Sequence, residues 1–64
     1  MDKETIMNMD ANMLLSILNM KLRDEFNTLE DLIKSYDLDI ELLTNKLSKS
    51  GYIYNVKINQ FTQK

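Results

Sequence analysis

The chain has 64 residues and contains no cysteine, no histidine, no proline and only one glycine. Without cysteine, no disulfide can stabilise the fold, and no thiolate can bind a metal or attack a substrate. Without histidine, the chain lacks the commonest general base and the commonest transition-metal ligand. The absence of proline and the scarcity of glycine favour a mostly helical chain with few loops.

Long apolar runs are missing as well. No segment approaches the ~20 apolar residues that a helix needs to cross a bilayer. Residues 1–6 mix charges and contain no apolar stretch of signal-peptide length. We therefore expect a cytoplasmic protein that is not embedded in a membrane. A chain of this length corresponds to one small domain with a core of modest stability.

Charge is distributed unevenly along the chain. Residues 1–41 hold ten acidic and four basic residues, a net charge of −6, whereas residues 42–64 hold four lysines and no acid, a net charge of +4. This asymmetry indicates a directional surface. The alternative is that Lys46 and Lys49 simply occupy the last turns of a helix, where cations interact favourably with the helix dipole.

The N-terminal half is predicted to contain a flexible tail followed by a helix. Residues 1–9 are assigned to the tail, because nothing in the pattern holds Met7 or Met9 against the rest. Residues 10–64 then form a single domain. Asp10 is expected to cap a helix that runs to about Phe26. The stripe of this helix that faces the core has spacings of three and four residues: Ala11, Leu14, Leu15, Leu18, Leu22 and Phe26.

Residues 28–47 have the spacing of a helix-turn-helix. Thr28 is expected to cap the first of these helices by accepting from Asp31, and Asp39 is expected to cap the second. Asp37–Asp39 forms the turn, and Gly51 ends the second helix because glycine readily adopts positive φ. The side chains predicted to be buried are Leu29, Leu32, Ile33, Tyr36, Leu38, Ile40, Leu43 and Leu47.

After Gly51 the pattern changes to that of a small β-hairpin. Residues 52–54 alternate and are rich in strand formers, and a turn is expected near residues 56–58. Phe61 then returns to the core. The alternative is one irregular strand over residues 52–58. The predicted fold is therefore mainly α, in the α+β class: three helices in a helix-turn-helix arrangement with a C-terminal β-hairpin, similar to a winged helix.

The second helix of the helix-turn-helix offers a candidate nucleic-acid face. Its members are side chains that contact bases or phosphates in other proteins: Asn45, Lys46, Lys49 and, on the hairpin, Lys57. Glu41 near the helix start would repel phosphate, and four lysines on an acidic protein make a weak electrostatic footprint. The alternative is that the motif is only a compact way to pack three helices.

The first long helix offers a candidate partner face. Met13, Ile17 and Met20 lie at positions i, i+4 and i+7, opposite the core stripe, so this helix is apolar on both sides. Methionine is common at adaptable interfaces. The alternative is that the N-terminal tail or the tyrosines of the hairpin cover these three side chains.

Neither a catalytic site nor a metal or cofactor site is expected. The neighbouring carboxylates at residues 24–25, 30–31 and 37/39 suit helix caps and first turns. A hydrolytic pair would need a shielded pocket, which small three-helix domains rarely have. The segment that starts at Asp37 begins like a calcium loop but has Leu42 where the loop requires glycine. We therefore expect a non-enzymatic binding module that acts by protein–protein contact or self-association, with weak nucleic-acid binding as the alternative.

Several motifs in the chain resemble those of a known family. They are Met13–Asp24 (MLLSILNMKLRD), Leu29–Leu32, Asp37–Asp39, Lys46–Leu47, Gly51–Asn55 and Asn59–Phe61 (NQF). Together they resemble a family of short bacterial proteins that is known only as a domain of unknown function. The resemblance covers about residues 12–61 and is most specific at residues 19–24 and 59–61. It implies a small bacterial, cytoplasmic protein, and it implies no activity.

The specific segment at residues 19–24 has two interpretations. Asn19, Lys21 and Arg23 could form a polar docking site on the sides of the helix. Alternatively, Arg23 pairs with Glu30 or Asp31 and fixes the next helix, which is the use we expect.

Overall fold

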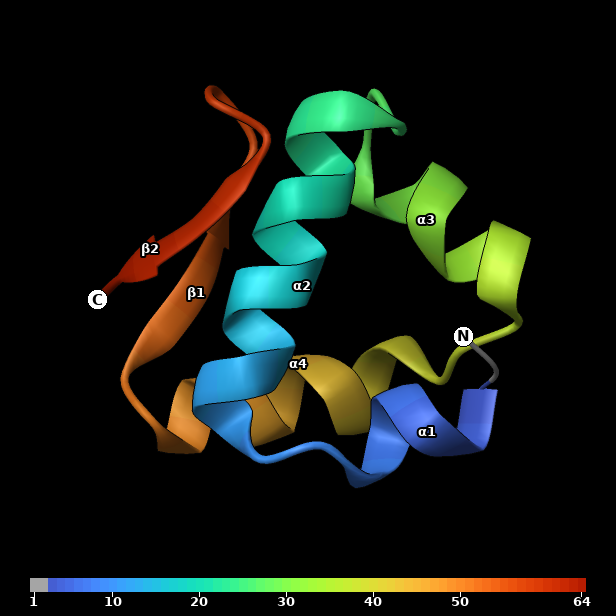
Figure 1. The fold of residues 1–64 in the computed structure, drawn as a ribbon. Coiled ribbons are helices and arrows are strands. Elements are labelled where there is room, and N and C mark those ends of the chain that lie inside the picture. Colours follow the sequence, from blue (N-terminus) through green and yellow to red (C-terminus); the bar gives the residue numbers. More distant parts are fainter. Residues whose placement is uncertain (1–2) are drawn as a thin grey trace.

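The computed structural model describes residues 3–64. Its elements are α1 (Lys3–Asn8), α2 (Ala11–Asp24), α3 (Leu29–Tyr36), α4 (Ile40–Lys49), β1 (Tyr52–Asn55) and β2 (Gln60–Gln63). The predicted mainly α fold of the α+β class with a C-terminal hairpin is confirmed. Figure 1 shows α2 running the height of the molecule, with the hairpin on one side, α3 on the other, and α4 and α1 across the lower end.

Each of the three predicted helix caps forms. The Asp10 carboxylate accepts from the Met13 amide at 2.8 Å, and the Thr28 hydroxyl accepts from the Asp31 amide at 3.1 Å. The Asp39 carboxylate accepts from the amides of Glu41 and Leu42, the second and third residues of α4. Each cap replaces the missing hydrogen-bond partners at a helix N-terminus, and this defines where α2, α3 and α4 begin.

Two left-handed residues end the helices of the helix-turn-helix. Asp37 has φ of 54° after α3, and Gly51 has φ of 91° after α4. Aspartate tolerates this conformation because its short side chain is polar, and glycine tolerates it because it has no Cβ. The three-residue turn that was predicted between the helices is therefore present.

The core lies between α2, the helix-turn-helix and the hairpin. The buried members are apolar residues from every helix, from the turn between α3 and α4, and from β2: Ile6, Leu14, Leu18, Leu22, Leu29, Leu32, Leu38, Leu43, Leu47 and Phe61. The structure corrects one predicted core residue, since Ile40 is 42% exposed. It is the first residue of α4, where no preceding turn covers its side chain, and it faces the hairpin across a groove.

The N-terminal segment also differs from its prediction. Residues 1–9 were assigned to a flexible tail, but residues 3–8 form α1, and the Ile6 side chain is buried. Lys46 on α4 donates to the Met7 carbonyl at 3.0 Å and so caps the C-terminal end of α1. Tertiary burial of one isoleucine holds a helix too short to be stable by its own propensity. Met1 and Asp2 lie outside the described residues.

Candidate functional site

The hairpin is attached to α2 by polar side chains. The register pairs Tyr54 with Phe61 and Asn55 with Gln60, so residues 56–59 form the turn. The Asn19 side chain accepts from the Phe61 amide at 2.7 Å and donates to the Phe61 carbonyl at 3.1 Å. A single amide side chain thus takes the place of a neighbouring strand along β2.

Asn59 occupies the corner where the hairpin meets the end of α2. Its φ is 53°, and its side-chain amide donates to the carbonyls of Leu22 at 3.0 Å and Phe26 at 2.9 Å. Its side-chain oxygen accepts from the Tyr54 hydroxyl. These carbonyls lie at and beyond the C-terminal end of α2, where helix carbonyls lack partners, so Asn59 caps that helix from a distant segment.

The Tyr54 hydroxyl continues this connection to α3. It accepts from the Leu29 amide, the first amide of α3, at 3.3 Å. Gln60 adds a bond to the Asn19 carbonyl at 3.0 Å. We call this set the α2–hairpin network; its members are Asn19, Tyr54, Asn59 and Gln60. The motif segments at residues 19–24 and 59–61 therefore meet in space, and their distinctive polar side chains bond to the protein's own backbone.

The charged residues of the same helix pair locally. The expected pairing of Arg23 with Glu30 or Asp31 is wrong: Arg23 contacts its neighbour Asp24 at 2.9 Å, and this guanidinium lowers the pKa of Asp24. Lys21 lies 5.1 Å from the centre of the Tyr36 ring and bonds to Glu25 at 3.3 Å. Contact with Tyr36, then with Glu25, raises the pKa of Lys21. Asn19, Lys21 and Arg23 are thus engaged in separate internal contacts.

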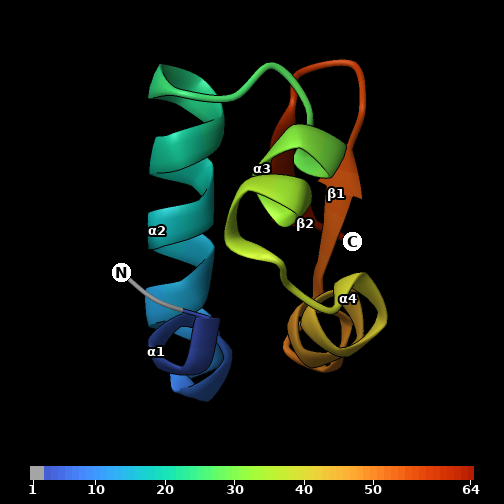
Figure 2. The same ribbon diagram turned by 90° about the vertical axis from the view of Figure 1, so that its right-hand side faces the viewer.

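The candidate partner face of α2 is exposed. Met13 is 54% exposed and Met20 is 46% exposed, while Ile17 between them is half-buried. Met7 and Met9 of the N-terminal segment and the hairpin residues Tyr52 and Tyr54 all pack against the core. Figure 2 shows the hairpin and α3 on one side of α2 and leaves its opposite side outermost.

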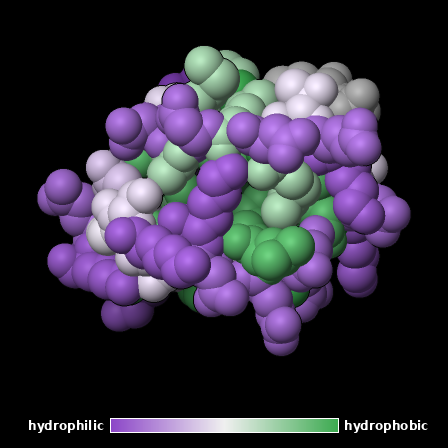
Figure 3. Space-filling view, turned by 90° about the horizontal axis from the view of Figure 1, so that it is seen from below, coloured by the Kyte–Doolittle hydropathy of each residue, from purple (hydrophilic) through white to green (hydrophobic). Residues whose placement is uncertain are grey.

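The candidate nucleic-acid residues are brought together only in part. Asn45, Lys46 and Lys49 line one hollow of about 490 Å³ between α4 and α1, with Leu42 beside them. Figure 3, which looks at this side, shows apolar atoms in the middle of the face with hydrophilic atoms around them. Lys57 belongs to the hairpin turn, which lies at the opposite end of the molecule from α4 (Figure 1). The strand β1 lies beside α4, but the turn that carries Lys57 lies away from it (Figure 1).

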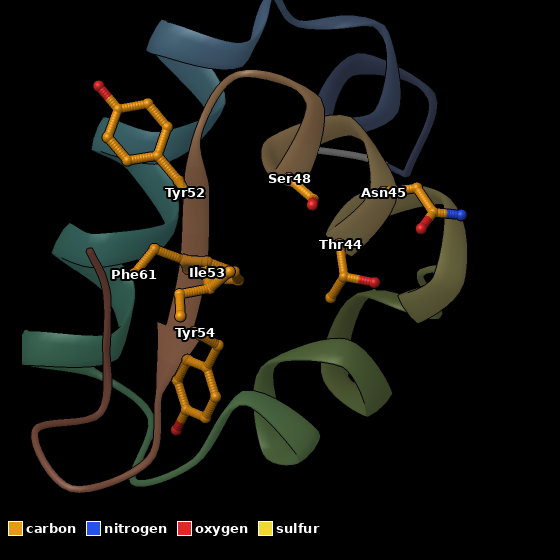
Figure 4. A pocket seen from close by; sticks show the side chains of 7 residues that line it. All are labelled: Thr44, Asn45, Ser48, Tyr52, Ile53, Tyr54 and Phe61. Atoms are coloured by element: carbon orange, nitrogen blue, oxygen red, sulfur yellow. The ribbon is translucent and has the colours of Figure 1, made fainter. Parts of the chain in front are cut away.

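A second apolar surface, outside the sequence-predicted faces, lies between α4 and β1. Two hollows meet at Tyr54, one of about 280 Å³ that includes Thr44, Ser48 and Ile53, and one of about 370 Å³ that includes Ile40 and Val56. Figure 4 shows Thr44 and Ser48 on the α4 side of the first hollow, with Ile53 on the strand opposite. We call the two hollows together the α4–β1 groove.

The sequence held a partial signal for this groove. The alternation of Tyr52, Ile53 and Tyr54 predicts that Ile53 points away from the two tyrosines, and Ile53 is 47% exposed. Nothing local, however, predicts that Ile40 lies beside the same strand.

Among residues 3–64, no helix is long and apolar enough to cross a membrane, and no group of three or more acidic side chains is arranged to hold a metal ion.

Comparison with protein-family models supplies the family. Residues 8–61 match the model of the domain of unknown function DUF4250, so the chain belongs to that family, and the resemblance to a family of unknown function is confirmed. Searches of curated proteins and of solved structures gave no match.

Proposed function

We propose that this protein is a non-enzymatic binding module that acts by protein–protein contact. One observation carries the proposal: the distinctive polar side chains are engaged inside the molecule, while large apolar side chains remain outside. The exposed large apolar residues are Met13, Met20, Ile40, Leu42, Ile53, Val56 and Ile58. Exposed apolar side chains that gather on one face or around one groove are typical of interaction sites.

Photo-crosslinking tests this proposal inside cells. A photoreactive amino acid replaces Met13, Met20 or Ile53 in separate variants, and a fourth variant carries it at the exposed Lys34 on α3 as a control. We expect discrete covalent adducts from at least one apolar position and none from Lys34, with the adducts identified by mass spectrometry. Adduct patterns that are the same at all four positions, or absent from all, would contradict protein–protein contact.

Nucleic-acid binding is the second candidate function. It is supported by the hollow that Asn45, Lys46 and Lys49 share on α4. Three features oppose it: Lys46 is engaged with the Met7 carbonyl, Leu42 occupies the same surface with 59% exposure, and Lys57 lies elsewhere.

A titration separates the two candidates. Labelled mixed-sequence DNA and RNA are added at about 50 mM salt, where phosphate contacts are strong. Amide shifts confined to α4, and lost as salt rises, would establish the second candidate. We expect no such shifts.

The proposal includes a location in the bacterial cytoplasm. The resemblance to short bacterial proteins and the cysteine-free sequence, which suits a reducing compartment, support it. Fractionation of a producing bacterium tests it, and recovery in the periplasmic or membrane fraction would contradict it.

A further inference from the structure

The two outer edges of the hairpin differ in whether their backbone groups have hydrogen-bond partners. In an antiparallel pair, two opposite residues either bond to each other or direct their backbone groups away from each other. Phe61 directs both of its backbone groups at Asn19, away from β1. Its partner Tyr54 must therefore direct its own N–H and C=O away from β2.

The same alternation applies to Tyr52, two residues earlier. The bond from the Lys64 amide to the Gly51 carbonyl, at 2.9 Å, agrees with this register. We call the outward N–H and C=O groups of Tyr52 and Tyr54 the β1 edge. Within residues 3–64, no hydrogen bond connects the β1 edge to another element.

The β1 edge also lacks two of the usual protections against pairing, a charged side chain and a proline. Natural edge strands are commonly protected by a charged side chain, a proline or a covering segment. The residues of β1 are Tyr52, Ile53, Tyr54 and Asn55, with no charge and no proline. The α4–β1 groove begins along this strand, and Figure 4 shows the hollow between the strand and the side chains of α4.

We propose that the β1 edge pairs with the same edge of a second copy of this chain, which joins the two hairpins into one four-stranded antiparallel sheet. This inference rests on the proposed function and names the partner. A two-fold axis at Ile53 pairs Tyr52 with Tyr54 of the second copy, and Tyr54 with Tyr52 of the second copy. All four outward N–H and C=O groups of each strand then have partners.

A second copy fits this edge for two reasons. The strand is uncharged, so antiparallel self-pairing brings no like charges together, and two-fold pairing is self-complementary by symmetry. Ile53 also meets Ile53 of the second copy as a non-hydrogen-bonded pair, the arrangement with the closest side chains. The flanking side chains of the α4–β1 groove add apolar area to an interface that would otherwise be only four residues long on each side.

The size of the interface predicts weak association. Stable interfaces bury about 800 Å² on each partner. The accessible surface of the chain is 4284 Å² in all, so a stable interface would have to cover a large share of it. Pairing along one short strand lies at the low end of this scale. Sedimentation should therefore be measured up to about 1 mM chain, because interfaces that bury less than about 1,200 Å² in total are transient.

The test uses opposite charges at the two-fold axis. Ile53→Lys places two ammonium groups across the axis, and Ile53→Glu places two carboxylates there, so each variant should weaken self-association by about tenfold or more. An equimolar mixture of the two variants should restore association by forming the mixed pair. Ile58→Lys is the matched control, since Ile58 is also exposed but lies in the turn.

A backbone variant keeps the test valid if a charged variant folds poorly. The chain is short enough for chemical synthesis, and N-methylation of the Tyr54 amide removes one donor of the β1 edge without changing a side chain. It should abolish association and leave the helical circular dichroism unchanged.

Three outcomes would overturn the inference: wild-type chain that keeps the mass of one copy at about 1 mM, a Lys/Glu mixture that does not associate, or an Ile58→Lys variant that is equally impaired. Crosslinked adducts to a different protein, together with a monomeric chain, would overturn the dimer and leave the proposed function intact. If no crosslinked adducts form and the chain also stays monomeric, the dimer and the proposed function are both overturned.

Discussion

The two outer edges of the hairpin differ, because the backbone groups of one edge are hydrogen-bonded to α2 and those of the other edge are not bonded to any residue that the structure describes. Along β2, the Asn19 side chain bonds to both backbone groups of Phe61, so α2 closes this edge. Along β1, the backbone groups of Tyr52 and Tyr54 have no partner within residues 3–64. Two strands are marginally stable by themselves, so the closed edge explains why the hairpin holds its place, and the open edge marks where more protein can be added.

Among substitutions around the two edges, Asn59→Ala is expected to lower the stability most. It removes the cap of α2 and the partner of the Tyr54 hydroxyl, and it forces alanine into positive φ. We expect a loss of about 3 kcal/mol in the free energy of unfolding, measured by urea denaturation.

Asn59→Gly serves as its control. Glycine keeps the backbone conformation and loses only the side-chain bonds. Asn59→Gly should therefore lower the free energy of unfolding by about 1 kcal/mol less than Asn59→Ala does. Equal losses from Ala and Gly would show that the left-handed φ of Asn59 contributes nothing to the difference.

Asn19→Ala should open the closed edge. It removes two hydrogen bonds to Phe61, and we expect a loss of about 2 kcal/mol with faster amide exchange at Phe61. Asn12→Ala is the matched control, since Asn12 is exposed on the same helix and gains the same helix propensity. If both variants behaved alike, the edge-closing role of Asn19 would be refuted.

Tyr54→Phe should weaken the connection between the hairpin and α3. It keeps the ring against Phe61, whose centre is 5.5 Å away, and removes only the hydroxyl that the Leu29 amide and Asn59 share. The expected loss is about 1 kcal/mol, measured by thermal unfolding. An unchanged midpoint would mean that water replaces the hydroxyl at no cost.

The smallest effect is expected on the open edge. Ile53→Thr keeps a β-branched residue at an exposed position, so the stability of the dilute chain should change by no more than about 0.5 kcal/mol. Denaturation at low micromolar concentration tests this. A loss above about 1.5 kcal/mol would show that Ile53 stabilises the fold of the single chain and is not reserved for contact with a partner.

Local signals in the sequence were sufficient for most of the secondary structure. Asp10, Thr28 and Asp39 cap the predicted helices, and Gly51 adopts the predicted positive φ, because a cap depends on residues within one turn of itself. The core stripe of α2 was predicted by its spacing, because that spacing is the periodicity of the helix itself.

The errors concern contacts between distant segments. Nothing near Ile6 in the sequence indicates that it is buried, and Ile40 was placed in the core by a periodicity that cannot show what lies above the start of α4. Arg23 was assigned a partner on α3, but the adjacent Asp24 is closer.

The sequence by itself determined α2, α3 and α4, their N-terminal caps, the turn of the helix-turn-helix and the hairpin, because these depend on neighbours along the chain. Only the tertiary structure decided the use of the motif residues: Asn19 and Asn59 are 40 positions apart, and their bonds to Phe61 and to the end of α2 exist only when the hairpin folds back. It also decided which strand edge is closed, because one helix can cover the hairpin from only one side.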